Sequence, residues 1–186
     1  MYKQPTRSVL YQILSEQEAL CLELSSKVSI SVILIIPQLP KKGGPEVIII
    51  DEYKRFDQTR KKKFPGGKME EIDSTVLDAA KREMLEETGF ILEDASVCFA
   101  GEFSSTIPGE RHYKVYFLVK KYRSSGEPYK KDSGILSWEP IEGIEKVVIK
   151  NHQYCLYNCI ESLKTWNREY AFALMNLNTK RFYEGE

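Results

Sequence analysis

The chain has 186 residues, which is enough for one domain with a proper core but too few for two domains of ordinary size. Its 27 basic residues balance 27 acidic ones, so the net charge does not argue for a nucleic-acid or membrane partner. Four cysteines without a CxxC pair and only two histidines argue against a structural zinc site or a disulfide framework.

The sequence also argues against export and membrane insertion. The N-terminal stretch MYKQPTRSVLYQ lacks the apolar core and the cleavage site of a secretory signal. The longest apolar run, VSISVILII at 28–36, is about half as long as a membrane-spanning helix. We therefore expect a single cytoplasmic domain over residues 1–186, with loosely ordered ends at 1–8 and 170–186.

The sequence predicts a series of strands and helices along the chain. The β-branched run 28–36 predicts a buried strand, and VIIIDEY at 47–53 predicts a second strand that pairs with it as a hairpin across a Pro- and Gly-rich loop. A helix is expected at 76–88. Further strands are expected at 96–103, 112–122 and 134–140, and a second helix from Asn151. This order predicts an α/β (α+β) fold with a mixed sheet that helices cover on both faces.

The helix at 76–88, VLDAAKREMLEET, has clear start and stop signals. Ser74 or Thr75 can cap its N-terminus, and Gly89 stands where a left-handed C-terminal cap belongs. The interior contains no glycine or proline. The sequence therefore predicts a helix with these bounds.

Three glutamates, Glu83, Glu86 and Glu87, share one face of this helix at spacings of three and four residues, so they lie about 5 to 6 Å apart. We expect this acidic face to stay open while the apolar side packs inward. An ordinary surface charge ladder through Asp78, Arg82 and Glu86 is the alternative interpretation.

The residues before the helix favour a metal site over a charge ladder. The turn PGGK, Pro65–Lys68, has two glycines without side chains, so its backbone can approach a ligand closely. A backbone carbonyl and several carboxylates together suit magnesium or manganese better than zinc.

Residues 67–90 resemble the signature box of the Nudix hydrolases. In that box a glycine is followed after five residues by glutamate, and after seven more by Arg-Glu, an aliphatic residue, any residue, Glu-Glu, any residue, glycine and an aliphatic residue. REMLEETGF matches this second half, with Phe90 in the final aliphatic place. The resemblance implies a Nudix-type α/β/α sandwich around a mixed central sheet and a Mg²⁺-dependent pyrophosphohydrolase, with Mn²⁺ as a substitute.

The resemblance also implies roles for individual residues. Gly67 would offer its carbonyl to the metal, with Glu83, Glu86 and Glu87 as carboxylate ligands. Arg82 would orient the glutamates. Either Glu86 or Glu87 would take the proton of the attacking water.

Glu110 is a second candidate for the general base. Its segment FSSTIPGERHYKVYFLV resembles the stretch in ADP-ribose hydrolases where a proline beyond the box precedes an acidic loop and a strand. The alternative for Glu110 is a solvated turn around Pro108 and Gly109.

The chain departs from the box in two ways. Asp73 stands where the family has its first glutamate, and eight residues instead of seven separate it from Arg82. We expect the extra residue to bulge the loop before the helix without disturbing the metal-binding glutamates. Asp73, Glu71 and Glu70 are all candidates for the supporting role of that first glutamate.

A basic, partly aromatic stretch lies between the second strand and the box. Arg55, Arg60 and the lysines 61–63 could meet phosphates, and Tyr53, Phe56 and Phe64 could stack on a base. Alternatively the basic residues form a solvated loop and the aromatic residues pack the core, and we favour the solvated loop for the lysines.

Substrate class follows only from the resemblance. ADP-ribose or a nucleotide sugar is favoured slightly over a modified nucleoside triphosphate or a dinucleoside polyphosphate. RNA-cap removal is prompted only by the basic stretch, and a nucleic-acid partner is not expected. A catalytically silent nucleotide-binding or interaction module is the alternative from another class, and a homodimer is compatible with the family.

Overall fold

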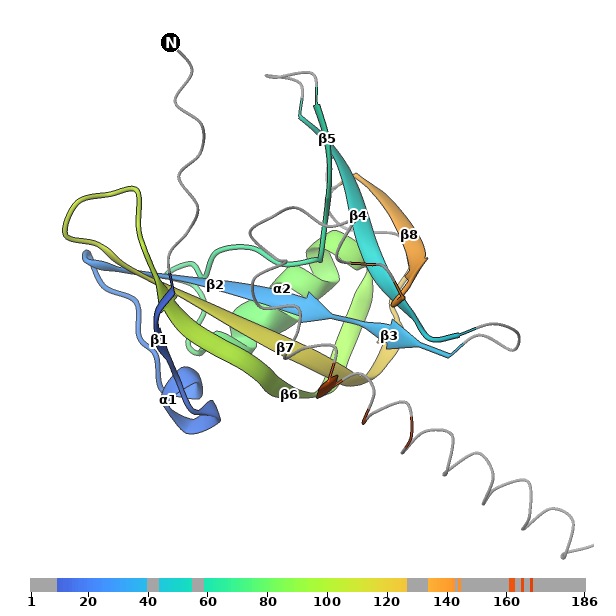
Figure 1. The fold of residues 1–186 in the computed structure, drawn as a ribbon, viewed down its shortest axis with the longest axis horizontal. Coiled ribbons are helices and arrows are strands. Elements are labelled where there is room, and N and C mark those ends of the chain that lie inside the picture. Colours follow the sequence, from blue (N-terminus) through green and yellow to red (C-terminus); the bar gives the residue numbers. More distant parts are fainter. Residues whose placement is uncertain are drawn as a thin grey trace, which may run out of the picture.

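The computed structural model describes residues 10–39, 44–54, 59–126, 134–142 and 144, together with 161, 162, 165 and 168. Its elements, drawn in Figure 1, are β1 (Leu10–Ile13), α1 (Glu16–Leu20), β2 (Val28–Ile35), β3 (Pro37–Gln38), β4 (Glu46–Lys54), β5 (Thr59–Lys63), α2 (Val76–Thr88), β6 (Phe90–Phe103), β7 (Arg111–Ser124) and β8 (Ile135–Pro140). Both chain ends and most of the helix expected from Asn151 lie outside the described residues. Within the described ranges, no helix has the length and apolar character needed to cross a membrane.

The strands form two sheets rather than one. In the first, ordered β1-β6-β7-β2, β2 runs parallel to β7 while the other pairs are antiparallel, so the expected mixed sheet is confirmed. In the second, β4 pairs with β3, β5 and β8, all antiparallel. Only Ile36 separates β2 from β3, so one stretch of chain passes from the first sheet into the second (Figure 1).

The expected hairpin between the first two long strands is wrong for β2 itself. β2 pairs with β7 along its whole length, and only the two residues of β3 pair with β4. The other edge of β2 is used by the glycine turn: Val32 N–H donates to the Gly67 carbonyl at 2.9 Å, and Leu34 N–H donates to the Pro65 carbonyl at 2.8 Å. Both edges of β2 are therefore occupied, which leaves no place for β4.

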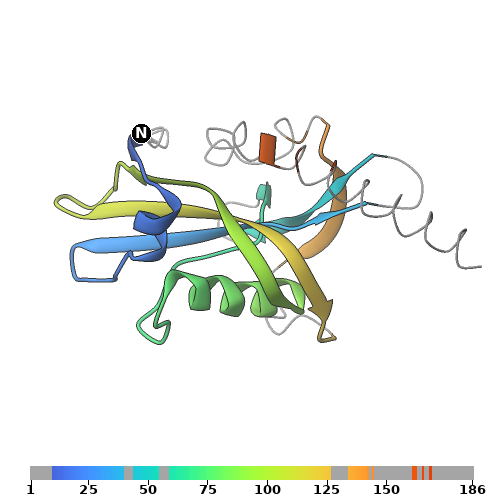
Figure 2. The ribbon, with the colours of Figure 1, turned by 90° about the horizontal axis from the view of Figure 1, so that it is seen from below.

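The apolar run of β2 is buried on both faces, as its sequence predicts. Side chains alternate across a strand, so Ile30, Val32 and Leu34 join the core on the α2 side, while Ile33 and Ile35 join a second core on the opposite side. Figure 2 shows α2 lying along one face of the strands. α2 itself contributes Val76, Ala79, Ala80 and Met84 to the first core.

The limits of α2 confirm the predicted helix. Thr75 is the N-cap, and its hydroxyl accepts a hydrogen bond from Asp78 N–H at 3.1 Å. Gly89 has φ 71° and closes the helix by donating to the Leu85 carbonyl at 3.0 Å. The left-handed turn leads directly into β6, which begins at Phe90. The strands expected at 96–103 and 112–122 correspond to β6 and β7, which are both longer than expected.

Candidate active site

The two glycines of the PGGK turn are required for different reasons. Gly66 has φ 136°, and a Cβ there would overlap the Val32 carbonyl oxygen. A Cβ on Gly67 would overlap the Glu83 carboxylate, so this side chain packs directly against the glycine backbone. The Gly67 carbonyl, expected as a metal ligand, accepts the Val32 N–H and retains its second lone pair.

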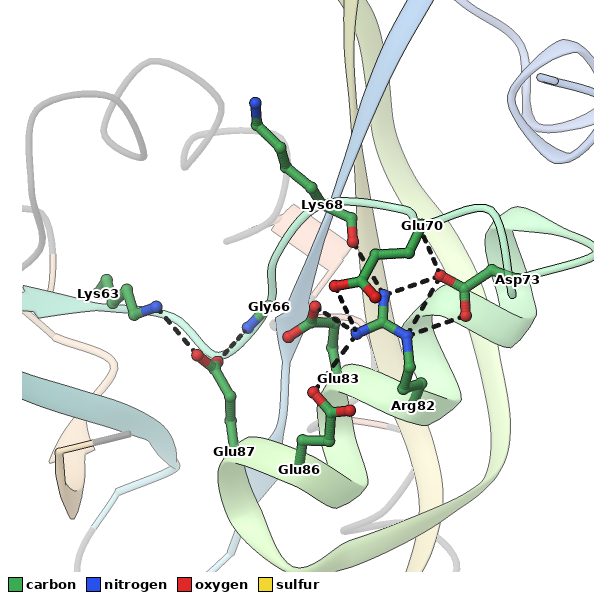
Figure 3. A network of polar contacts seen from close by, with 9 residues as sticks. All are labelled: Lys63, Gly66, Lys68, Glu70, Asp73, Arg82, Glu83, Glu86 and Glu87. Carbon is green, nitrogen blue, oxygen red and sulfur yellow. Dashed lines mark hydrogen bonds and ion pairs between the residues drawn. The ribbon is translucent and has the colours of Figure 1, made fainter. Parts of the chain in front are cut away.

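The acidic face of α2 is not open to solvent, contrary to expectation. Glu83 and Glu87 are buried, with 4% and 7% of their surface exposed, and Glu86 is half-buried. A buried carboxylate requires hydrogen bonds or a counter-ion. Here the glycine turn and two cationic side chains provide them, as Figure 3 shows.

Glu87 is held from both sides. One carboxylate oxygen accepts the backbone N–H of Gly66 at 2.7 Å, and the other accepts from Lys63 Nζ at 3.0 Å. Gly66 therefore contributes its N–H to the site as well as its unusual conformation. The sequence pattern did not indicate the contact with Lys63, because β5 and α2 are joined only through the tertiary structure.

Arg82 is the centre of the polar network in Figure 3, and its side chain is 17% exposed. Its guanidinium donates to Asp73 at 2.8 Å, to Glu83 at 2.8 Å and to Glu86 at 3.4 Å. It also donates to the Lys68 carbonyl at 2.9 Å. The hydrogen bond to Asp73 is the main cause that raises the pKa of Arg82. The Arg82–Glu86 step of the expected charge ladder is present, but Arg82 binds the buried Asp73 and Glu83 at shorter distances, so a surface ladder does not describe its role.

Asp73 is the acid that occupies the place of the first glutamate of the box. It is buried and takes two nitrogens of Arg82, Nε at 3.0 Å and Nη2 at 2.8 Å. Glu70 is exposed and reaches Arg82 only at 3.9 Å, and Glu71 is exposed. Burial alone would raise the pKa of Asp73, but hydrogen bonds from Arg82 and from Glu70 N–H hold it below its ordinary value.

Glu110 lies in the loop between β6 and β7. Its half-buried carboxylate accepts a hydrogen bond from the Ser105 hydroxyl of the same loop. Gly109 has φ 78° and forms the turn expected beside Pro108. No recorded contact within the described part of the chain joins Glu110 to the carboxylates of α2, so its catalytic role stays a prediction.

The basic stretch before the box is strand β5, not a solvated loop. Arg60 pairs with Asp51 at 3.0 Å, and Lys62 pairs with Glu139 at 2.6 Å. Phe64 is 1% exposed and belongs to the core, which confirms the packing interpretation for this aromatic residue and excludes base stacking. Arg55, Phe56 and the side chain of Tyr53 lie outside the described residues.

The chemical types of the donor groups fit magnesium or manganese, but the positions of the side chains in this structure do not form a complete ion site. Carboxylates of Glu83, Glu86 and Glu87 beside a glycine backbone are the oxygen ligands that these ions prefer. Among the described residues, however, no three acidic, His or Cys side chains converge closely enough to hold an ion. Lys63 draws Glu87 to one side, and Arg82 draws the other two glutamates to the opposite side.

The sequence matches the NUDIX domain family over residues 28–158, which is more than half of the chain. This chain belongs to the Nudix family. Membership places it among the pyrophosphohydrolases, which act on phosphorus-containing acid anhydrides. No relative was found among curated proteins.

Solved structures similar to this Nudix chain support the fold. A NUDIX hydrolase from Nitrosomonas europaea has a TM-score of 0.58 at 20% identity, covering 73% of this chain and 90% of that one. The NUDIX domain of Shewanella oneidensis NrtR, complexed with ADP ribose, has a TM-score of 0.60 at 13% identity, covering 81% and 99%. A C. elegans Ap4A hydrolase has a TM-score of 0.54 at 15% identity, covering 73% and 98%.

Proposed function

We propose that this Nudix chain hydrolyses the pyrophosphate linkage of a nucleoside diphosphate derivative in a Mg²⁺-dependent reaction, with Mn²⁺ as a substitute. One observation carries the proposal: Glu83 and Glu87 are buried against the backbone of Gly67 and Gly66 instead of facing solvent, and the half-buried Glu86 lies on the same face of α2. Burial of several carboxylates at one place costs stability. A purely structural role does not explain why the chain carries that cost, whereas a binding site for a cation does.

Each residue has a defined task in the proposed reaction. Glu83, Glu86 and Glu87 would hold the metal, and Gly67 keeps the approach open and would offer its carbonyl. A bound divalent cation supplies positive charge to the pyrophosphate and activates water for in-line attack. Arg82, fixed by Asp73, holds Glu83 and Glu86 in place between reactions.

Glu86 is the general base that we place first. Its side chain is 21% exposed, more than that of Glu83 at 5% or Glu87 at 9%, so it is the most accessible to water. Both oxygens of Glu87 already accept hydrogen bonds. Glu110 is the second candidate because it lies in a separate loop that a substrate could reorganise.

ADP-ribose or a nucleotide sugar is the substrate class that we propose first. The similarity to a NUDIX domain complexed with ADP ribose is compatible with this class, although at 13% identity it supports the fold alone. A modified nucleoside triphosphate or a dinucleoside polyphosphate is the alternative, and the fold is shared equally with an Ap4A hydrolase. We expect the protein to act in the cytoplasm without a nucleic-acid partner.

The proposal is tested by measuring phosphate release, after coupling to a phosphatase, from ADP-ribose, nucleotide sugars, dinucleoside polyphosphates and modified triphosphates with Mg²⁺. We expect one class to be hydrolysed, and Glu86→Gln or Glu87→Gln to lower the rate by about 10³-fold or more. Glu139→Gln is the control, because this carboxylate pairs with Lys62 rather than with the site.

Two results would contradict the proposal. Equal turnover by the parent and both glutamine variants would remove the acidic face from the reaction. Binding of nucleotide and metal without turnover of any class would replace the enzyme by a silent nucleotide-binding module.

A further inference from the structure

Lys63 is a cation placed directly against a proposed metal ligand. Its Nζ lies 3.0 Å from Glu87 Oε1, and the two side chains are 20% and 9% exposed. An ion pair with this little exposure is screened less by solvent than a surface pair. In the structure Lys63 therefore occupies a carboxylate oxygen that a metal ion would need (Figure 3).

Strand geometry makes this placement specific to Lys63. Successive side chains of β5 point to opposite faces, so Lys63 faces α2 while its neighbour Lys62 pairs with Glu139 on β8 at 2.6 Å. Both lysines lie on β5, and each pairs with a different glutamate. Of these two, Lys63 is the one that reaches the acidic face of α2.

The charge at the site explains why a second cation is present. Five carboxylates lie in this network, and Arg82 pairs with four of them: Glu70, Asp73, Glu83 and Glu86. Glu87 pairs with Lys63 instead. Without Lys63, the buried Glu87 would lack a counter-ion in this network, which would be costly.

The side chains of Arg82 and Lys63 differ in how easily each can leave its carboxylate partners. The guanidinium of Arg82 is held by several hydrogen bonds in a fixed planar arrangement, whereas Lys63 is a point charge on a flexible stem. Among the residues that the structure describes, Glu87 is the ion-pair partner of Lys63. Lys63 is therefore the cation that can change partners.

We propose that Lys63 is a phosphate-binding residue that exchanges partners during binding, an inference that rests on the proposed function. In the free protein its ammonium neutralises Glu87. A divalent cation held by Glu87 would take the place of the ammonium, and Lys63 would then be available to bind a phosphate oxygen of the substrate. Lysine is a suitable group because its ammonium binds phosphate as a point charge.

The exchange predicts effects of opposite sign for one substitution. Lys63→Met removes a positive charge from beside the metal site and frees Glu87, so metal binding becomes tighter. The same change removes a phosphate contact, so nucleotide binding becomes weaker. A lysine that only supported the fold would not give this pair of effects.

The experiment measures Mn²⁺ binding without nucleotide, and then binding of α,β-methylene ADP, which resists hydrolysis at that bond, at saturating Mn²⁺. For Lys63→Met we expect a Kd for Mn²⁺ about 5- to 10-fold lower and a Kd for the analogue about 10-fold higher. Lys63→Arg keeps the charge and should stay within about 3-fold of the parent in both. Lys62→Met is the matched control and should match the parent.

The inference is overturned if Lys63→Met leaves the Kd for Mn²⁺ and the Kd for the analogue unchanged, or if it raises both. Glu87→Gln separates this outcome from failure of the proposed function. If Glu87→Gln leaves the Mn²⁺ affinity unchanged, the metal site itself is wrong. If it weakens Mn²⁺ binding while Lys63→Met does not strengthen it, only the partner exchange is wrong.

Discussion

At the level of single residues, the glycines at 66 and 67 are neighbours with unequal tasks. Gly66 serves the backbone: its φ of 136° and its contact with Val32 exclude any side chain. Gly67 serves the site, because the atom that a side chain would meet belongs to the Glu83 carboxylate. Stability and metal binding should therefore separate between the two positions.

Gly66→Ala should lower the free energy of unfolding by about 2 to 4 kcal/mol, because it combines backbone strain with overlap of a fixed carbonyl. Gly67→Ala should cost about 1 kcal/mol or less, since Glu83 can rotate away, but should weaken Mn²⁺ binding about 10-fold. Urea unfolding and metal titration measure these quantities. Gly44→Ala is the control, since nothing lies within 4 Å of the added Cβ. A larger loss of stability in Gly67→Ala, or a larger loss of Mn²⁺ affinity in Gly66→Ala, would contradict these separate tasks.

Asp73→Asn tests the brace on Arg82. The folded-state pKa of Asp73 lies below its ordinary value of 3.8, so the ionised carboxylate stabilises the fold above about pH 4. That stabilisation is lost as the pH falls through the folded-state pKa. We expect Asp73→Asn to cost about 2 to 4 kcal/mol at pH 7 and progressively less below about pH 4, measured by urea unfolding. Glu71→Gln, at an exposed acid in the same loop, is the control and should change the free energy of unfolding by less than about 0.5 kcal/mol.

At the level of elements, α2 is a helix whose limits depend on local chemistry and whose acidic face depends on distant partners. Thr75 and Gly89 close its two ends without help from other elements. The burial of Glu83 and Glu87 requires the glycine turn, β2 and β5 to lie against it. Changes at the cap should therefore affect stability and leave the acidic site intact.

Thr75→Ala should lower the free energy of unfolding by about 1 kcal/mol, because the Asp78 N–H loses its acceptor. Thr75→Ser keeps the hydroxyl and should recover most of the loss. The Kd for Mn²⁺ should remain that of the parent in both variants. A cap variant that loses metal binding would show that the helix end and the site are coupled.

At the level of the whole molecule, the zero net charge conceals a local excess of acid. Five carboxylates gather around Arg82 and Lys63 at the turn between the strands and α2. A cation that binds this region in the folded state alone must stabilise the fold. Thermal stability is therefore a measure of metal binding that does not require turnover.

Addition of Mg²⁺ to the chelator-treated protein should raise Tm, with a gain in stability of about 2.7 kcal/mol when the ion is at 100 times its Kd. Scanning calorimetry of the parent and of Glu87→Gln measures the effect, which we expect to be largely lost in the variant. Glu139→Gln should retain it. An equal rise in all three proteins would indicate nonspecific binding of the ion.

The sequence by itself determined the features that depend on neighbours within one helical turn. Capping residues set the limits of α2, helical spacing gathered Glu83, Glu86 and Glu87 on one face, and the same letters carried the resemblance to the Nudix box. These features could be predicted because helix caps and helical periodicity involve residues three or four apart.

Only the tertiary structure decided which distant segments meet. In the folded chain β2 pairs with β7 and with the glycine turn instead of with β4. Asp73, rather than Glu70 or Glu71, makes the close contact with Arg82, and Lys63 pairs with Glu87 across 24 residues of chain. Strand partners and buried ion pairs depend on which backbone edges and charges remain unsatisfied once the whole chain has packed. No local pattern contains that information.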